Sequence, residues 1–336
     1  MRVVVTGASG NVGSATLREL TSEGRHDVVA VARRLPELPA VDVPTSVRWR
    51  SADVGHDDLD AVLEGADAVV HLAWKFQPTH RPEETWQTNA VGTRRVLDAV
   101  RRLRVPKVVC VCSVASYSPF DPADPDRAVD ESWPTDGASS AAYCREKAYV
   151  ERVLDAFEAA QTETRLVRIR PAFVFQRSAA TEQRRIFGGA LLRPWMLDSR
   201  FLPGVPLPQG LRLQAVHAED VARALVAAVE RPVTGAFNLA GPGVVRRREL
   251  GELLGVPTVE VPGRLVSAAV NTGWLARVVR VPGSLADALL VLPLMDAARA
   301  HDELDWRPQH TAEEALAAFV DGARHSAGSS LPPLRP

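Results

Sequence analysis

The 336-residue sequence contains few lysines, tyrosines and cysteines, with three of each. Cys110, Cys112 and Cys144 are odd in number and lack the paired spacing of a zinc site. This pattern excludes a disulfide-stapled fold and predicts free thiols and no metal. Because lysine and tyrosine are both scarce, a short motif that contains both has only a small probability of arising by chance.

The sequence also lacks an excess of charge and a long apolar run. Its 40 basic and 41 acidic residues give a formal charge of -1, which argues against a nucleic-acid partner or an anionic membrane. No stretch approaches the roughly 18 apolar residues that span a bilayer, and residues 3–5 are too short an apolar run for an export signal. We therefore expect a cytoplasmic protein with a small-molecule partner. Its 46% hydrophobic content suffices for a large core.

Short apolar runs alternate with segments of helical periodicity over the first half of the chain. Such alternation predicts an α/β fold of the Rossmann type, with a doubly wound parallel sheet covered on both faces. The predicted strands are 3–5, 28–31, 47–49, 68–72, 107–112 and 164–169, and the predicted helices are 12–20, 57–63, 83–103 and 139–160. The two long helices are also candidates for the contact in a homodimer.

The alternation breaks after Pro171 and resumes with a helix at 219–230 and a strand at 236–239. We therefore predict a dinucleotide-binding domain made of 1–171 and about 213–242. A smaller, interleaved C-terminal substrate-binding lobe takes 172–212 and 243–325, with aromatic residues that include Trp195 and Phe201. Residues 326–336 are predicted to form a polar tail.

A glycine-rich turn joins the first predicted strand to the first predicted helix. Glycines at this position allow a tight turn, so that a pyrophosphate reaches the free N–H groups at the helix N-terminus. The predicted cofactor contacts in this turn are Gly7, Ser9, Gly10, Asn11, Val12 and Gly13.

The residues after the second predicted strand bear on the choice of cofactor. Sites that bind NAD commonly place a carboxylate here, whereas this chain has Arg33 and Arg34. Because arginine pairs well with phosphate, the pattern favours NADP(H), with NAD(H) as the alternative. Asp53, followed by Val54, is predicted to contact the adenosine, although Asp53 is equally suited to capping a turn.

The most informative motif is Tyr143-x-x-x-Lys147 in a predicted helix, where positions i and i+4 share one face. A lysine beside a tyrosine favours tyrosinate, so we expect the tyrosine to transfer protons near neutral pH. Ser113 ends the fifth predicted strand, at the sheet edge where such folds bind ligands, and is predicted to hydrogen-bond the substrate.

In these motifs the sequence resembles the extended short-chain dehydrogenase/reductases, also called the NAD-dependent epimerase/dehydratase family. The resemblance covers most of the chain. The matching segments are Thr6 to Gly13, His71-Leu72-Ala73, Asn89 to Thr93, Ser113 to Tyr117, Tyr143 to Lys147, Arg170-Pro171, Val216 to Ala222, Phe237-Asn238-Leu239 and Leu304 to Pro308.

The resemblance implies a role for several residues. Ser113, Tyr143 and Lys147 would form the catalytic triad, with Asn89 supporting it, and Tyr143 and Lys147 would also contact the cofactor. Further cofactor contacts implied by the resemblance are Leu72, Ala73, Pro171, Phe173 and Val174. His217 and Asp220 match positions that we take as structural.

The sequence also departs from the family pattern. Phe173 stands where nucleotide-sugar epimerases commonly carry an asparagine, which argues against a nucleotide sugar. The residues after Ser113 are Val114-Ala115 rather than the Asp-Glu pair of dehydratases, which argues against dehydration. The aromatic side chains of Trp74, Phe76 and Phe173 predict an apolar substrate pocket, which Ser113 completes.

Three hypotheses follow. The leading one is an NAD(P)-dependent oxidoreductase that interconverts a carbonyl and a secondary alcohol on a small, fairly apolar substrate, with Tyr143 as acid/base. The first alternative is an NAD-dependent epimerase acting on a nucleotide sugar. The second alternative is a non-catalytic NADP-binding regulator.

Overall fold

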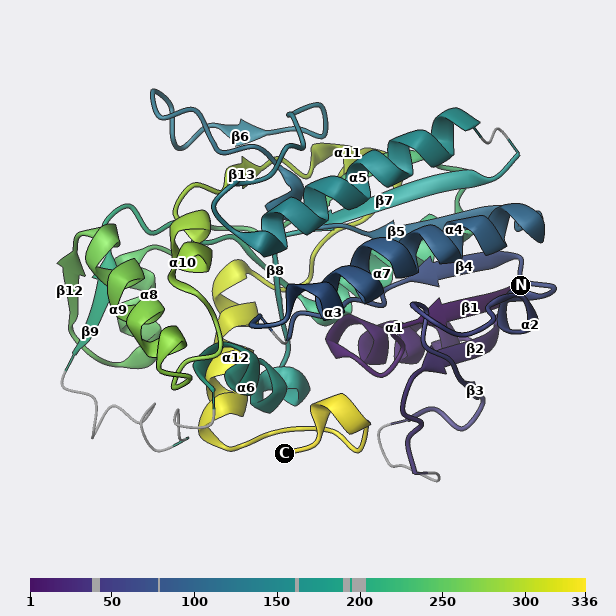
Figure 1. Ribbon diagram of the computed structural model, residues 1–336, viewed down its shortest axis with the longest axis horizontal. Coiled ribbons are helices and arrows are strands. Elements are labelled where there is room, and N and C mark those ends of the chain that lie inside the picture. Colours follow the sequence, from purple (N-terminus) through teal and green to yellow (C-terminus); the bar gives the residue numbers. More distant parts are fainter. Residues whose placement is uncertain (38–42, 78, 161–162, 190–193, 195–203) are drawn as a thin grey trace.

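A seven-stranded parallel sheet forms the centre of the molecule (Figure 1). The computed structural model describes residues 1–37, 43–77, 79–160, 163–189, 194 and 204–336. The strand order is β11-β7-β5-β4-β1-β2-β3, which confirms the predicted Rossmann-type α/β fold. The strands are β1 (Arg2–Thr6), β2 (Asp27–Ala32), β3 (Arg48–Ser51), β4 (Ala68–His71), β5 (Lys107–Val111), β7 (Arg165–Pro171) and β11 (Gly235–Leu239).

Alternate residues of these strands enter two separate cores, one on each face of the sheet. Val3 and Val5 of β1 pack with α1 (Asn11–Ser22) and α7 (Ala218–Glu230). Val4 points the other way and packs with α4 (Gly92–Arg102) and α5 (Ala142–Ala160). Strands that are buried on both faces need a continuous run of apolar residues. Such runs are the signal from which these strands were predicted.

The predicted helix 83–103 is divided into three parts. It consists of α3 (Pro82–Trp86), a π-helical turn over Gln87–Val91, and α4. π-Helical turns within a helix often occur at functional sites, and this one contains Asn89. The predicted helix 139–160 begins later than expected, at Ala142.

Outside the central sheet, three strand pairs belong to the C-terminal half or link it to the rest. They are β8 (Phe173–Phe175) with β10 (Ala215–His217), β9 (Val205–Pro208) with β12 (Thr258–Val261), and β6 (Ala128–Val129) with β13 (Leu294–Met295). The remaining helices are α2 (Asp60–Leu63), α6 (Ala180–Gly188), α8 (Arg247–Leu254), α9 (Gly263–Leu275), α10 (Gly283–Leu289), α11 (Ala298–Glu303) and α12 (Ala312–Arg324). Figure 1 shows the β9–β12 pair at one end of the molecule with α8, α9 and α10. Trp195 and Phe201 lie outside the described residues.

The prediction of a polar tail over 326–336 is wrong for its last part. Leu331 and Leu334 are buried in a small cluster with Val43 and Ala179, next to a short helical turn over Pro332–Leu334. Two leucines separated by a helical turn present one apolar face, and this face packs on the body of the protein. The C-terminal segment is therefore part of the folded structure.

Buried ion pairs fix α5 against β7. Glu151, with no exposed surface, accepts hydrogen bonds from Arg170 Nε at 2.8 Å, Arg170 Nη2 at 3.0 Å and Arg168 Nη1 at 3.2 Å. Arg168 also donates to Asp155 at 2.6 Å. Because α5 carries Tyr143 and Lys147, these pairs set the position of both residues relative to the sheet.

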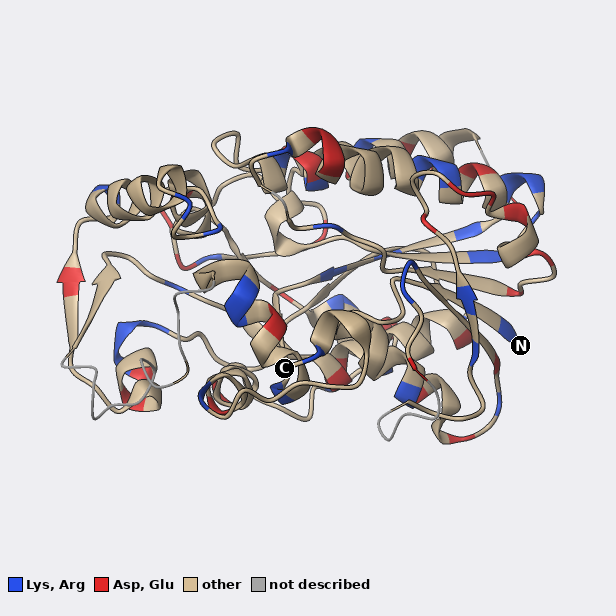
Figure 2. Cartoon of the chain, turned by 60° about the horizontal axis from the view of Figure 1, so that its bottom comes forward, with Lys and Arg blue, Asp and Glu red and all other residues tan. Residues whose placement is uncertain are grey.

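Among the described residues, no helix has the length and apolar character needed to cross a membrane. Figure 2 shows acidic and basic residues interspersed along the outer helices, as the nearly zero net charge suggests.

Candidate functional site

The glycine-rich turn packs against the end of β4. Gly7 has a φ of 68°, and a Cβ there would lie 2.6 Å from the Ala73 amide nitrogen. A Cβ at Gly13 would lie 2.4 Å from the Gly7 carbonyl oxygen. Glycine is therefore required at both positions, because any side chain would separate the turn from its neighbours.

A groove of about 630 Å³ runs along this turn, which is within the range of small-molecule sites. Its walls include twelve of the predicted cofactor residues: Gly7, Ser9, Gly10, Asn11, Val12, Gly13, Arg33, Arg34, Asp53, Val54, Leu72 and Ala73. A Cβ at Gly10 would meet only the Gly7 carbonyl, at 3.4 Å, so the turn leaves open space where a pyrophosphate would approach. The residues present thus fit a dinucleotide.

Asp53 caps a turn, as the sequence allowed, and also lines the groove, while its contact with an adenosine stays a prediction. Its Oδ1 accepts a hydrogen bond from Gly55 N at 2.8 Å, which closes a turn, and its side chain lines the groove. Oδ2 lies 4.0 Å from Arg33 Nη1. The pair lies across the ends of β2 and β3.

Tyr143 and Ser113 meet at the carboxyl edge of the sheet. Ser113 follows β5, and its Oγ accepts a hydrogen bond from Ala115 N at 3.1 Å. Burial raises the pKa of Tyr143 to about 12, although a hydrogen bond with Ser113 opposes the increase. Desolvation thus outweighs the favourable contacts, so the neutral phenol is the favoured form of Tyr143, and proton transfer by Tyr143 near neutral pH stays a prediction.

Lys147 lies one turn further along α5, on the face that carries Tyr143. Its Nζ lies 3.5 Å from the centroid of the Trp74 ring and donates to the Val111 carbonyl at 3.3 Å. Burial lowers the pKa of Lys147 to about 8, although the neighbouring Cys112, Glu151 and Glu146 act to raise it. The ammonium therefore remains charged at neutral pH, with the indole ring over it.

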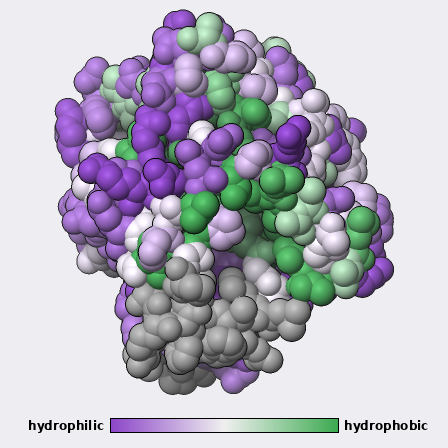
Figure 3. Space-filling view, turned by 90° about the vertical axis from the view of Figure 1, so that its left-hand side faces the viewer, coloured by the Kyte–Doolittle hydropathy of each residue, from purple (hydrophilic) through white to green (hydrophobic). Residues whose placement is uncertain are grey.

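Aromatic side chains surround Tyr143. The Trp74 ring lies edge-on at 5.9 Å between centroids, and the Phe76 ring lies at 5.1 Å. Phe76 also contacts Phe187 of α6 at 5.4 Å. Figure 3 shows apolar side chains gathered around a hollow on one end of the molecule. The predicted substrate residues Trp74, Phe76 and Ser113 thus lie at or near Tyr143.

The side chain of Asn89 connects the Lys75 backbone to Glu146 of α5. Its amide exchanges hydrogen bonds with the Lys75 backbone at 2.7 and 2.8 Å and donates to Glu146 Oε2 at 2.6 Å. Thr85 Oγ1 donates to the other carboxylate oxygen at 2.7 Å. None of the described hydrogen bonds of Asn89 reaches Ser113, Tyr143 or Lys147. The buried Glu146, which the sequence reasoning missed, thus links α5 to the segment that carries Trp74 and Phe76.

Five predicted cofactor residues are not among those that line the groove: Tyr143, Lys147, Pro171, Phe173 and Val174. Pro171 ends β7, and Phe173 packs into the core while its backbone N donates to the Gln214 carbonyl. The Val174 carbonyl accepts a hydrogen bond from Asn11 Nδ2 at 3.0 Å. The Val174 backbone thus contacts the end of the glycine-rich turn through Asn11.

The sequence reasoning also missed one side of the groove. Glu182, Arg185 and Ile186 of α6, with Pro332 and Pro333 of the C-terminal turn, complete its lining. Arg185 Nη2 donates to the Pro333 carbonyl at 3.1 Å and to the Arg335 carbonyl at 2.7 Å. No sequence motif marks these residues, because they reach the groove only through the fold.

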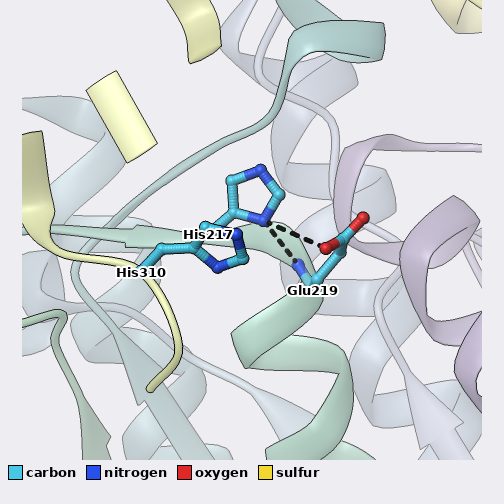
Figure 4. Close-up of side chains that lie close together, drawn as sticks. All are labelled: His217, Glu219 and His310. Carbon is cyan, nitrogen blue, oxygen red and sulfur yellow. Dashed lines mark hydrogen bonds and ion pairs between the residues drawn. The ribbon is translucent and has the colours of Figure 1, made fainter. Parts of the chain in front are cut away.

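A second cluster combines His217, Glu219 and His310, whose ligand-type atoms lie within 4.8 Å of one another (Figure 4). His217 Nδ1 accepts from Glu219 N at 3.4 Å and so caps α7, while His310 Nδ1 pairs with Asp220 at 2.9 Å. The two imidazole rings lie 4.2 Å apart with a 32° angle between their planes. The contact between the rings and the pairing of His310 with Asp220 join the C-terminal segment to α7.

A dinucleotide-sized groove beside a tyrosine, a serine and a lysine at a sheet edge defines an enzyme of the Rossmann class. The chain belongs to the NAD-dependent epimerase/dehydratase family, whose model matches residues 3–240. The resemblance seen in the sequence is thereby confirmed. Because members of this family are enzymes, the hypothesis of a non-catalytic regulator is disfavoured.

Two curated relatives cover nearly all of this chain. An uncharacterized protein of Mycobacterium tuberculosis is 28% identical over 98% of the chain, which spans only 31% of that protein's length. The chain thus spans about a third of the first curated relatives that it matches. A UDP-glucose 4-epimerase of Corynebacterium glutamicum is 26% identical over 93% of this chain and 92% of its own.

Solved structures with the same fold include further epimerases. The UDP-glucose 4-epimerase of Stenotrophomonas maltophila, solved with NAD and formylated UDP-arabinopyranose, has a TM-score of 0.72 at 21% identity and covers 97% of this chain and 98% of its own. The UDP-glucose 4-epimerase of Thermus thermophilus, solved with NAD, has a TM-score of 0.69 at 20% identity and covers 96% and 99%. At these identities the likeness shows a shared fold. The NAD in both structures does not support the predicted preference for NADP(H).

Proposed function

We propose that this protein interconverts a secondary alcohol and a ketone in an epimerase cycle, in which the same substrate molecule is oxidised and then reduced. The observation that carries the proposal is the position of Tyr143, hydrogen-bonded to Ser113 and surrounded by Trp74 and Phe76. The dinucleotide that the groove fits supplies the acceptor and donor of hydride when bound.

The residues of the chain divide the remaining work. The Tyr143 phenolate oxygen takes up the proton of the substrate hydroxyl during oxidation, and the resulting Tyr143 hydroxyl returns the proton during reduction, while Ser113 orients the substrate oxygen. The Lys147 ammonium stabilises negative charge on Tyr143 in the state that accepts the proton. The raised pKa of Tyr143 favours the neutral phenol, which is the form that donates a proton during reduction.

Two observations support the epimerase mode over net oxidation or reduction. The likeness to the Corynebacterium epimerase extends over nearly the whole of both chains. In addition, α6 and the C-terminal turn line the groove opposite the sheet, as suits a dinucleotide that stays bound between turnovers. We take NAD as the cofactor and a nucleotide sugar as the first substrate class to test.

A second candidate is net oxidoreduction of an apolar substrate, the leading hypothesis from sequence. The specific observation in its favour is the aromatic wall of Trp74, Phe76 and Phe187 beside Tyr143. Phe173, which replaces the asparagine common in nucleotide-sugar epimerases, points the same way.

Two measurements distinguish these functions. Mass spectrometry of the small molecules released on denaturation shows whether a dinucleotide is retained, and stoichiometric NAD is expected for the epimerase. Turnover is then measured with UDP-hexoses by product separation and with alcohols and ketones at 340 nm. Tyr143→Phe should abolish turnover, whereas Tyr149→Phe, an exposed tyrosine on the same helix, should leave it unchanged. Equal activity of both variants would refute the role of Tyr143.

A further inference from the structure

Besides Asp53, the groove holds a second carboxylate, that of Glu182, on a segment in which the sequence predicted no cofactor contact. Arg33 and Arg34 line the groove from the end of β2, and Glu182 and Arg185 line it from α6. The positive charges of Arg185 and Arg34 both act on the Glu182 carboxylate. Glu182 and Arg34 therefore line the same groove, although 148 positions of the chain separate them.

The helix that carries Glu182 is anchored on both sides of the groove. Gln176, just before α6, donates to the Asn11 carbonyl at 2.7 Å and to Asn11 Oδ1 at 2.9 Å. Gln183 donates to the Val174 carbonyl at 2.8 Å, and Arg185 binds the C-terminal carbonyls. These contacts hold Glu182 in place relative to the glycine-rich turn.

The end of the second strand is where Rossmann sites distinguish the two dinucleotides. A carboxylate there accepts hydrogen bonds from the ribose hydroxyls of NAD, and the same negative charge repels the 2′-phosphate of NADP. We propose that Glu182 makes this chain select NAD over NADP, and that it supplies from α6 the carboxylate that is missing after β2. This inference rests on the proposed function only in assuming that a dinucleotide binds.

The ionisation of Glu182 determines the conditions of the test. Burial raises the pKa of Glu182 to about 7, while Arg185 and Arg34 act to lower it. At pH 8 the carboxylate is mostly ionised, so binding is measured there.

The experiment compares the dissociation constants of NADH and NADPH by quenching of tryptophan fluorescence. We expect the full-length wild-type protein to bind NADH more tightly than NADPH. Glu182→Gln should lower the ratio of the NADPH dissociation constant to the NADH dissociation constant by about tenfold or more. The control is Glu37→Gln, which removes an exposed carboxylate paired with Arg335 at 2.9 Å. This control should leave the ratio unchanged.

Two outcomes would overturn the inference alone. One is tighter binding of NADPH by the wild type at pH 8, and the other is a ratio in Glu182→Gln within about twofold of the wild type. If Glu182→Gln fails to fold, 5′-AMP and adenosine 2′,5′-bisphosphate are compared as competitors for the wild-type groove, which tests whether the groove disfavours a 2′-phosphate. Stronger competition by the bisphosphate would refute the inference. If neither dinucleotide binds, the proposed function falls together with this inference.

Discussion

Replacing Glu151 by glutamine tests whether the buried ion pairs hold the catalytic helix in place. The substitution keeps the shape of the side chain and removes its charge. It leaves the guanidinium groups of Arg168 and Arg170, which lie 2.8 to 3.2 Å from the carboxylate oxygens, with an uncharged partner. One amide N–H group then faces a donor instead of an acceptor.

The expected cost follows from the burial of the pair. Glu151 has no exposed surface and Arg170 is 4% exposed, so water does not compensate for the lost charge. Breaking such a pair typically costs about 3–5 kcal/mol of unfolding free energy. For a chain of this length the entropy of unfolding is about 0.7 kcal/mol per kelvin, so the midpoint of thermal unfolding should fall by about 4–7 °C.

Thermal unfolding followed by circular dichroism at pH 7 measures the effect. The control is Asp155→Asn, because Asp155 also binds Arg168, at 2.6 Å, but its side chain is 48% exposed. That pair should contribute at most about 1 kcal/mol. A midpoint for Glu151→Gln within about 2 °C of the wild type would refute the reasoning.

The pH dependence provides a second check of the same reasoning. Burial acts to raise the pKa of Glu151, but its bonds and attraction to Arg170 and Arg168 hold the pKa below its ordinary value. Stability from a carboxylate with a lowered pKa is present at neutral pH and is lost as the pH falls through the folded-state pKa. The difference between wild type and Glu151→Gln should therefore shrink under acidic conditions.

The remaining predictions concern other parts of the molecule. The rings of Trp86 on α3 and Tyr149 on α5 lie 4.6 Å apart, and the two residues are 40% and 41% exposed. We therefore expect light scattering to show a homodimer, which substitution of both residues by glutamate converts to monomers. A wild-type monomer would exclude this interface. The folded-state pKa of Glu182 is raised from 4.5 to about 7, so its ionisation costs stability as the pH rises. Between pH 5 and 8, the unfolding free energy of Glu182→Gln should therefore increase relative to that of the wild type, by at most about 3 kcal/mol. A difference in unfolding free energy that stays constant over this range would contradict the assignment. Lys107 donates to the Ala228, Val229 and Arg231 carbonyls at the end of α7, so Lys107→Met should lower the free energy of unfolding by about 2–4 kcal/mol. Lys75→Met, which breaks a partly exposed pair with Glu84, should lower it by less than about 1 kcal/mol. Equal losses of the two variants in urea unfolding would refute a larger contribution from the three bonds to carbonyls.

Part of the site could be predicted from the sequence because local rules govern it. Positions four apart share a helix face, so Tyr143 and Lys147 had to lie together once α5 was recognised. Strand ends meet at one edge of a parallel sheet, which brings Ser113 to the same place. The glycine-rich turn is equally local, since Gly7 and Gly13 are needed for contacts with neighbouring backbone.

Other features of the site depend on contacts between residues far apart in the sequence. Burial raises the pKa of Tyr143, and the rings of Trp74 and Phe76 lie against Tyr143, a contact that no spacing in the sequence reveals. The π-helical turn and the position of Asn89 likewise follow from packing against Lys75 and Glu146. Helical periodicity alone does not distinguish such a turn from a regular helix.

The sequence alone determined the fold class, the glycine-rich turn and the group of Tyr143, Lys147 and Ser113, because each depends on short-range periodicity or on the geometry common to parallel sheets. The tertiary structure alone decided what surrounds them: the indole of Trp74 over Lys147, and Glu182 and Pro332 in the wall of the groove. These residues come from segments far apart in the chain that carry no shared pattern, so their meeting depends on how the second half of the chain packs against the first.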